Sequence, residues 1–239
     1  MSEMLFIPKV EVDRQRVAKH LGYTSALPSA VNKAIDDSLD RANDLISPRG
    51  VYNLKEIVSF SGESILIEGN ISFNTAKIGS YLIKCCDQIA VFLLTIGHDL
   101  EKEVDKLMGQ GEFLSALILD ALGSEAVDTA ANHFKELIRG SQNERGVTPR
   151  FSPGCCDWKL SDQSSIFKLL DSSKLGVELT ESYMMIPRKS ISGVVGLGRI
   201  EKTIKEPIPC QFCSNRDCPN WALFHSKEKT FKVNEMRGC

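Results

Sequence analysis

Three cysteines lie close together near the end of the 239-residue chain, where Cys210, Cys213 and Cys218 are separated by two and four residues. Thiolates at this spacing can bind zinc or an iron–sulfur cluster. Either site needs a fourth ligand. The candidates for it are Cys239, which we favour, His225, Cys155 and Cys156. The sequence therefore predicts a metal centre, either structural zinc or a redox cluster.

A second candidate site is a loop that begins at Arg150 and reads Arg-Phe-Ser-Pro-Gly-Cys. Proline and glycine break regular structure here. The planar guanidinium of Arg150 suits a carboxylate, whereas Ser152 and Gly154 would present backbone groups on a rigid turn. The alternatives are a surface ion pair for the arginine and a plain turn for the loop.

Two carboxylates could meet a cation. Glu125 lies beside apolar positions of an expected helix, and Glu181 belongs to the segment Leu-Thr-Glu-Ser-Tyr-Met-Met-Ile-Pro at residues 179–187. A carboxylate near an apolar surface needs a positive partner. For each one a structural salt bridge is the more common use, and the ammonium group of a ligand is the alternative.

These residues require a scaffold in which helices and strands alternate irregularly, which favours an α+β fold over a doubly wound parallel sheet. The glycines at 193, 196 and 198 have the wrong spacing for a dinucleotide-binding loop and predict a glycine-softened strand and turn. Apolar periodicity predicts helices at residues 28–46, 98–108, 112–139 and 161–170, with a shorter one at 75–85. Strands are expected at residues 50–60, 64–68, 89–96, 177–180 and 190–195.

The composition is that of a globular protein, with 42% hydrophobic residues, 25% charged residues and a net charge of -2. No basic stripe indicates a nucleic-acid partner, and the longest apolar run, residues 89–96, is too short to span a membrane. We infer no signal peptide and expect the eight cysteines to be reduced thiols in the cytoplasm. We divide the chain into a main domain at residues 1–206 and a cysteine-rich appendage at 207–239.

The Arg150 loop and the segment at residues 179–193 together resemble the activation (reactivation) domain of cobalamin-dependent methionine synthase. In that family an Arg-Pro-x-Pro-Gly-Tyr loop precedes a helix, and Thr-Glu-Ser-x-x-Met-x-Pro leads into Ser-x-Ser-Gly. The order and separation of the two blocks are alike here. Cys155 departs from the family because it replaces the tyrosine. Trp158 could supply a replacement ring, or it could pack in the core.

The resemblance implies a C-shaped α+β fold, with a mixed or antiparallel sheet flanked by helices and a groove for S-adenosylmethionine. The family's loop arginine matches Arg150, which would then bind the ligand's carboxylate. The expected ligand-binding residues are Arg150, Ser152, Gly154, Cys155, Glu181 and Glu125. The ligand's methyl group would face a cobalamin held by a partner, after flavodoxin or ferredoxin had supplied an electron.

Our first functional hypothesis is therefore reductive reactivation, by methylation of cob(II)alamin, of a corrinoid protein or of a methionine synthase that lacks its own activation domain. The chain would act as an auxiliary part of a cobalamin-dependent methyltransferase, and whether it is itself an enzyme is open. The sequence has no corrinoid-binding Asp-x-His-x-x-Gly segment, so cobalamin would come from the partner. The alternative is a redox or binding module that carries a metal centre and does not bind S-adenosylmethionine.

Overall fold

The computed structural model describes residues 3–23, 27–75, 83–141, 145–199 and residue 216. The domain boundary expected after residue 206 lies outside these residues, as does most of the helix expected at 75–85. So do the four predicted metal ligands, Cys210, Cys213, Cys218 and Cys239. The two-part division of the chain and its metal centre therefore stay predictions.

A seven-stranded sheet forms the centre of the described chain, and all its pairings are antiparallel. The strand order is β4-β3-β2-β5-β9-β6, and β1 pairs with β2. A separate two-stranded hairpin is formed by β7 and β8. The strands are β1 (Met4–Phe6), β2 (Arg49–Ser61), β3 (Ser64–Ile67), β4 (Ile71–Asn74), β5 (Cys86–Thr95), β6 (Gly146–Val147), β7 (Glu178–Leu179), β8 (Met185–Ile186) and β9 (Ser190–Gly198).

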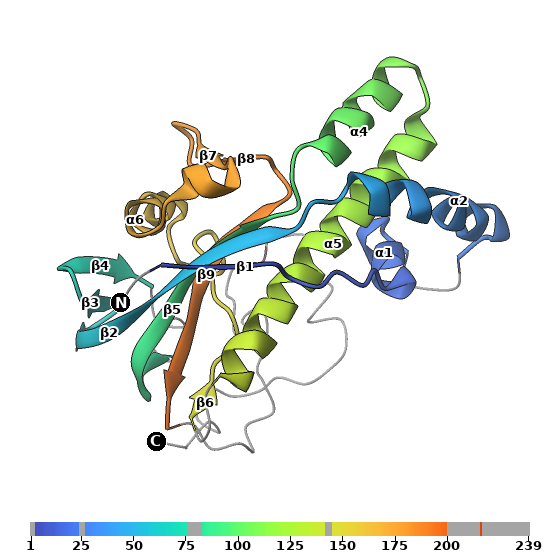
Figure 1. Cartoon of the computed structure of the whole chain (residues 1–239). Helices are drawn as coiled ribbons and strands as arrows, with labels where there is room; N and C mark the ends of the chain where they lie inside the picture. The colour runs from blue at the N-terminus through green and yellow to red at the C-terminus, as the bar shows by residue number, and fades with distance from the viewer. Residues whose placement is uncertain (1–2, 24–26, 76–82, 142–144, 200–215, 217–239) are drawn as a thin grey trace.

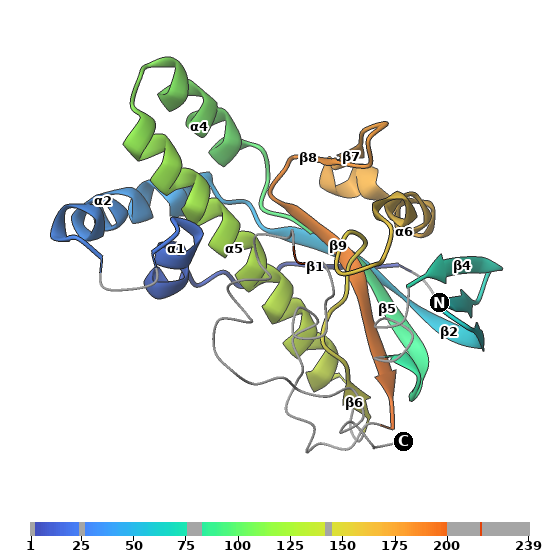
Figure 2. The same cartoon turned by 180° about the vertical axis from the view of Figure 1, so that it is seen from behind.

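Helices cover both faces of this sheet, as Figures 1 and 2 show. The alternation of side chains along β5 gives each face its own core. Phe92 and Leu94 belong to one hydrophobic cluster, and Val91 and Leu93 belong to the other. The first face carries α1 (Arg14–His20), α2 (Ser29–Leu45), α4 (Asp99–Gly109) and α5 (Phe113–Gly140), and the second carries α6 (Gln163–Leu169) between short 3-10 turns at Leu160–Asp162 and Ser172–Leu175. The predicted α+β class is confirmed.

The ends of these layers give the chain the C-like outline that the resemblance implies. In Figure 1 the α4 end of the helical layer and the β7–β8 hairpin both project beyond the same end of the sheet. From the α4 end, α5 runs down the sheet alongside β9. None of the helices in the described part of the chain combines the length and apolar character that crossing a membrane requires.

The glycine-rich segment at residues 193–198 is the C-terminal part of β9. The predicted strand is confirmed there, whereas the turn predicted with it is wrong, because Gly198 still pairs with Cys86 of β5. Its glycines permit close approach of neighbouring chain segments. A Cβ atom at Gly193 would lie 2.5 Å from the carbonyl oxygen of Phe151, and one at Gly196 would lie 2.6 Å from the sulfur of Cys86. Real Cβ atoms do not tolerate such distances, so β9 needs glycine at these positions to fit between its neighbours.

Two local features differ from the sequence-based expectation. Helix α1 was not predicted, because a seven-residue helix carries only two buried side chains, Val17 and Ala18. Ser161 does not cap the helix expected at 161–170, because it lies in the 3-10 turn that precedes α6. The Asp162 carboxylate instead accepts a hydrogen bond from Trp158 Nε1 at 2.9 Å and another from a backbone N–H of β4.

Candidate functional site

The loop that begins at Arg150 leaves the sheet with successive side chains on opposite faces. Phe151 bridges Val194 of β9 through two backbone hydrogen bonds of 2.9 and 2.8 Å. Side chains alternate along extended chain. Phe151 therefore packs into the core under α6, whereas Arg150 reaches α5 on the other face. The pairing of Phe151 with β9 thus directs the guanidinium of Arg150 toward α5.

Beyond Phe151 the loop turns back on itself and is anchored by a buried tryptophan. Gly154 has a φ of +86° and donates its N–H to the carbonyl of Trp158 at 2.8 Å. The indole stacks on Phe151, with ring centroids 5.0 Å apart, and makes an edge contact with Phe73 at 5.8 Å. Trp158 is therefore a core residue. It does not supply a ring in place of the tyrosine that is absent at Cys155.

Arg150 forms an ion pair with an acid that the sequence-based site did not include. Its Nη2 donates to Asp128 Oδ1 of α5 at 2.7 Å, and the two side chains are 25% and 30% exposed. Both charges are thus partly shielded from water but still reachable by a solute. The signal for Asp128 was its spacing, because Asp120, Ser124 and Asp128 recur every four residues and lie along one side of the helix.

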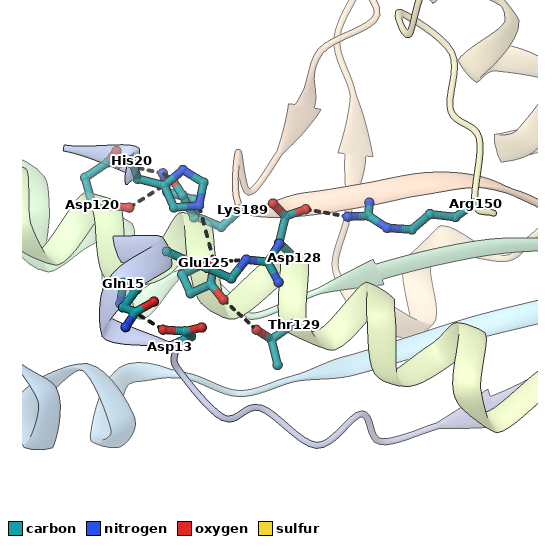
Figure 3. Close-up of polar contacts among 11 residues, drawn as sticks. Asp13, Gln15, His20, Asp120, Glu125, Asp128, Thr129, Arg150 and Lys189 are labelled. Atoms are coloured by element: carbon teal, nitrogen blue, oxygen red, sulfur yellow. Dashed lines mark hydrogen bonds and ion pairs between the residues drawn. The ribbon is translucent and has the colours of Figure 1, made fainter. Parts of the chain in front are cut away.

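The same side of α5 carries a second basic contact from the start of β9. Lys189 Nζ lies 2.8 Å from Asp120 Oδ1 and 2.8 Å from Ser124 Oγ. Figure 3 shows Asp120 and Asp128 on the same side of α5, with Lys189 and Arg150 approaching them from separate segments. This stripe of α5, with its two basic partners, is the candidate site.

Glu125 lies one turn from Asp128 but is sealed from solvent, with a side chain only 1% exposed. Thr129 donates to its Oε1 at 3.1 Å. Arg16 Nε and His20 Nε2 of α1 each lie 3.4 Å from Oε2. These distances suit ion pairing, although Oε2 has no hydrogen bond of acceptable geometry among the described residues. In the structure Glu125 therefore faces basic side chains of α1, as the salt-bridge alternative expects, and its predicted role in binding the ligand stays a prediction.

A family model described as "Vitamin B12 dependent methionine synthase, activation domain" matches residues 80–199. That segment is half of the chain and includes α5, the Arg150 loop and β9. The chain belongs to this family. The resemblance carried by the two sequence blocks is therefore confirmed.

A solved structure also matches this activation domain in fold. It is described as a crystal structure of the MetH reactivation domain bound to AdoHcy. The match has a TM-score of 0.64 and 18% sequence identity, and it covers 82% of this chain and 78% of that one. None of the curated proteins compared with the chain matches it in sequence.

The other loop residues that were predicted to bind the ligand lie at or near the surface. Gly154 and Cys155 are exposed, and Ser152 is half-buried. The backbone N–H of Cys155 donates to the carbonyl of Ser152 at 3.0 Å, which closes the turn. The exposed thiol at Cys155 therefore occupies the place where the family has tyrosine, with no aromatic ring at that position.

Glu181 lies at the tip of the β7–β8 hairpin, where it is exposed and has no hydrogen-bond or ion-pair partner within the described ranges. The hairpin itself is firmly held. Thr180 and Met184 exchange hydrogen bonds of 2.9 and 3.0 Å across the tip. The buried Gln163 donates to the carbonyl of Tyr183 and accepts from Ser192 Oγ of β9. No contact joins Glu181 to Arg150, so its place in a common site stays a prediction.

The cysteines of the described chain correct one expectation. Cys85 is disulfide-bonded, so the prediction that every cysteine is a reduced thiol is wrong for this residue. Cys86, Cys155 and Cys156 are thiols, and burial raises the pKa of Cys86 to about 12, opposed in part by the charge of Arg145. Within the described ranges, no three His, Cys, Asp or Glu side chains gather as a metal site would require.

Proposed function

We propose that this chain binds S-adenosylmethionine through Arg150 and Asp128 and supports the reductive methylation of cobalamin held by a corrinoid partner. The observation that carries the proposal is the partly exposed Arg150–Asp128 pair. It joins the loop that carries the family resemblance, through Arg150, to the long helix α5, through Asp128.

The amino-acid end of S-adenosylmethionine has a carboxylate and an ammonium group, which match this pair in charge. The guanidinium of Arg150 would bind the carboxylate as a planar fork, and Asp128 would accept hydrogen bonds from the ammonium. Each protein charge then exchanges one opposite partner for another, so neither is left uncompensated. The exposures of 25% and 30% leave both groups open to such an exchange.

The chain's own contribution is to hold the ligand in place. S-adenosylmethionine supplies the methyl group: its sulfur–carbon bond breaks with the electron pair left on sulfur, and a cobalt–carbon bond forms from the electron pair of cob(I)alamin. One electron from flavodoxin or ferredoxin first reduces cob(II)alamin. No proton is transferred in these steps. Arg150 and Asp128 would therefore act by positioning, without a side-chain acid or base.

The partner is a corrinoid protein or a cobalamin-dependent methyltransferase, and we place the reaction in the cytoplasm. The predicted metal centre at Cys210, Cys213, Cys218 and Cys239 is not needed for this scheme. If it is an iron–sulfur cluster, it would offer an electron route to cobalt. If it is zinc, it would have a structural role.

The test is anaerobic visible spectroscopy of a corrinoid protein in the cob(II)alamin state, with reduced flavodoxin and S-adenosylmethionine. We expect the methylcobalamin spectrum to appear only when the chain is present. Reactions that lack the chain, the ligand or the reductant are the controls. Calorimetry with S-adenosylmethionine measures binding separately. A rate of methylcobalamin formation equal to that of the chain-free control would falsify the proposal.

A further inference from the structure

We infer that Lys189 is a positioning residue for this site. Its side chain fixes helix α5 against the start of β9, so that Asp128 stays opposite Arg150 when the ligand binds. The inference rests on the proposed function, because it concerns the binding of the ligand's amino-acid end.

Every polar group of Lys189 is engaged by a different element. Its backbone N–H donates to Glu101 Oε1 of α4 at 2.5 Å. Its carbonyl accepts from the N–H of Ile96, at the end of β5, at 3.2 Å. Its ammonium binds Asp120 and Ser124 of α5, both at 2.8 Å, and its side chain is only 12% exposed. Lys189 therefore connects α4, β5 and α5 at the point where β9 begins.

A glycine in the middle of α5 makes room for α4 beside this contact. A Cβ atom at Gly123 would lie 2.7 Å from Leu100 Cδ2 and 3.4 Å from Lys189 Cε. A glycine inside a helix costs about 1 kcal/mol relative to alanine. Its presence here allows Leu100 of α4 to approach α5 closely, next to the Lys189 side chain, for which 3.4 Å is an ordinary contact distance.

The contact lies on the same stripe of α5 as the ligand-binding pair. Asp120 and Asp128 are eight residues apart, which is about 12 Å along a helix. The stripe is thus held at two points, by Lys189 at one end and by Arg150 at the other. When a ligand draws Arg150 and Asp128 to its own charges, their direct bond weakens. Lys189 is then the basic residue that continues to hold this side of α5.

Arg188 provides a matched control, because it is the adjacent basic residue but does not contact α5. Its Nε and Nη2 lie 3.5 Å from Glu101 and Asp105 of α4, and its side chain is 58% exposed. Arg188→Met and Lys189→Met each remove one positive charge from the same turn. Only the second change removes a contact with the stripe that carries Asp128.

The experiment titrates each variant with two ligands, AdoHcy and 5′-deoxy-5′-methylthioadenosine, which has the nucleoside but lacks the amino-acid end. We expect Lys189→Met to raise the Kd for AdoHcy about tenfold, as for coupled neighbouring groups. Its Kd for the truncated ligand should equal that of the wild type. Arg188→Met should change neither Kd, and Lys189→Arg, which keeps the charge, should recover part of the AdoHcy affinity.

If Lys189→Met only weakened the fold in general, the Kd would rise equally for both ligands, and that result would overturn the inference. An equal change of the Kd for AdoHcy in Lys189→Met and Arg188→Met would also overturn it. Should Lys189→Met fail to fold, Asp120→Ala removes the ion pair from the helix side, and we expect the same result from it. Failure of the wild-type chain to bind AdoHcy would instead overturn the proposed function, and the positioning role with it.

Discussion

Two acids on α5, only three residues apart, have different surroundings. Glu125 is sealed beneath α1 and faces Arg16 and His20 of that helix. Asp128 is 30% exposed and faces Arg150 from a surface loop. Each acid has an arginine partner, so residue type and pairing do not separate them. What separates them is the exposure of the acid itself, because a ligand can reach a carboxylate that is 30% exposed but not one that is 1% exposed.

The surroundings of Glu125 also explain why its sequence context predicted a positively charged partner. A carboxylate among apolar helix positions needs a cation, and a ligand or a neighbouring helix can provide it. Here α1 provides it, through two side chains that project from a helix of only seven residues. We therefore expect Glu125 to stabilise the fold and Asp128 to bind the ligand, and substitutions at these and neighbouring positions test that expectation.

The largest effect is expected from Glu125→Ala. This change removes a buried side chain and the acidic partner of Arg16 and His20, so α1 loses its main polar attachment to α5. We expect the free energy of unfolding in urea to fall by about 3 kcal/mol. AdoHcy affinity should stay within about threefold of wild type. A large loss of affinity in a variant that remains folded would place Glu125 in the ligand site after all.

The next effect is expected from Arg150→Ala, with Asp128→Ala as its counterpart on the helix. The pair is partly exposed, so its loss should lower the free energy of unfolding by less than about 1 kcal/mol. Affinity for S-adenosylmethionine should fall about 100-fold, as expected when a bidentate charged contact is lost. Calorimetry and urea unfolding measure the two quantities side by side. Unchanged affinity would remove Arg150 from the site.

The smallest effect is expected from the buried thiol of Cys86, whose ionisation makes the stability of the fold depend on pH. Burial raises the pKa of Cys86 from 9.0 to about 12 in the folded chain. The folded state therefore retains a proton that the unfolded state releases above pH 9, so stability falls as the pH rises from 9 toward 12. Between pH 7 and pH 10 this contribution is roughly 1 kcal/mol. Urea unfolding of Cys86→Ala should show a correspondingly smaller decrease over that range, and an identical decrease would contradict the burial of Cys86.

Much of the fold could be predicted from local pattern. The long helix expected at residues 112–139 is α5 (Phe113–Gly140), and the buried strand expected at 89–96 lies within β5 (Cys86–Thr95). The helix has apolar residues at helical spacing and the strand is a continuous apolar run, and both bury many apolar side chains. Helix α1 was missed because two buried residues make no detectable periodic pattern, and its stability depends on contacts with α5.

The amino-acid sequence alone was enough to identify the family, through two motifs in a fixed order, at the Arg150 loop and at residues 179–193. It also determined the principal elements, because hydrophobic periodicity is a local property that does not depend on distant contacts. Only the tertiary structure decided which acid faces Arg150. Residues 128 and 150 are 22 positions apart in the sequence, and their meeting depends on strand alternation at Phe151 and on the packing of α5 against β9. Burial is likewise a property of the whole fold, which is why Glu125 and Asp128 look alike in sequence and differ in the folded chain.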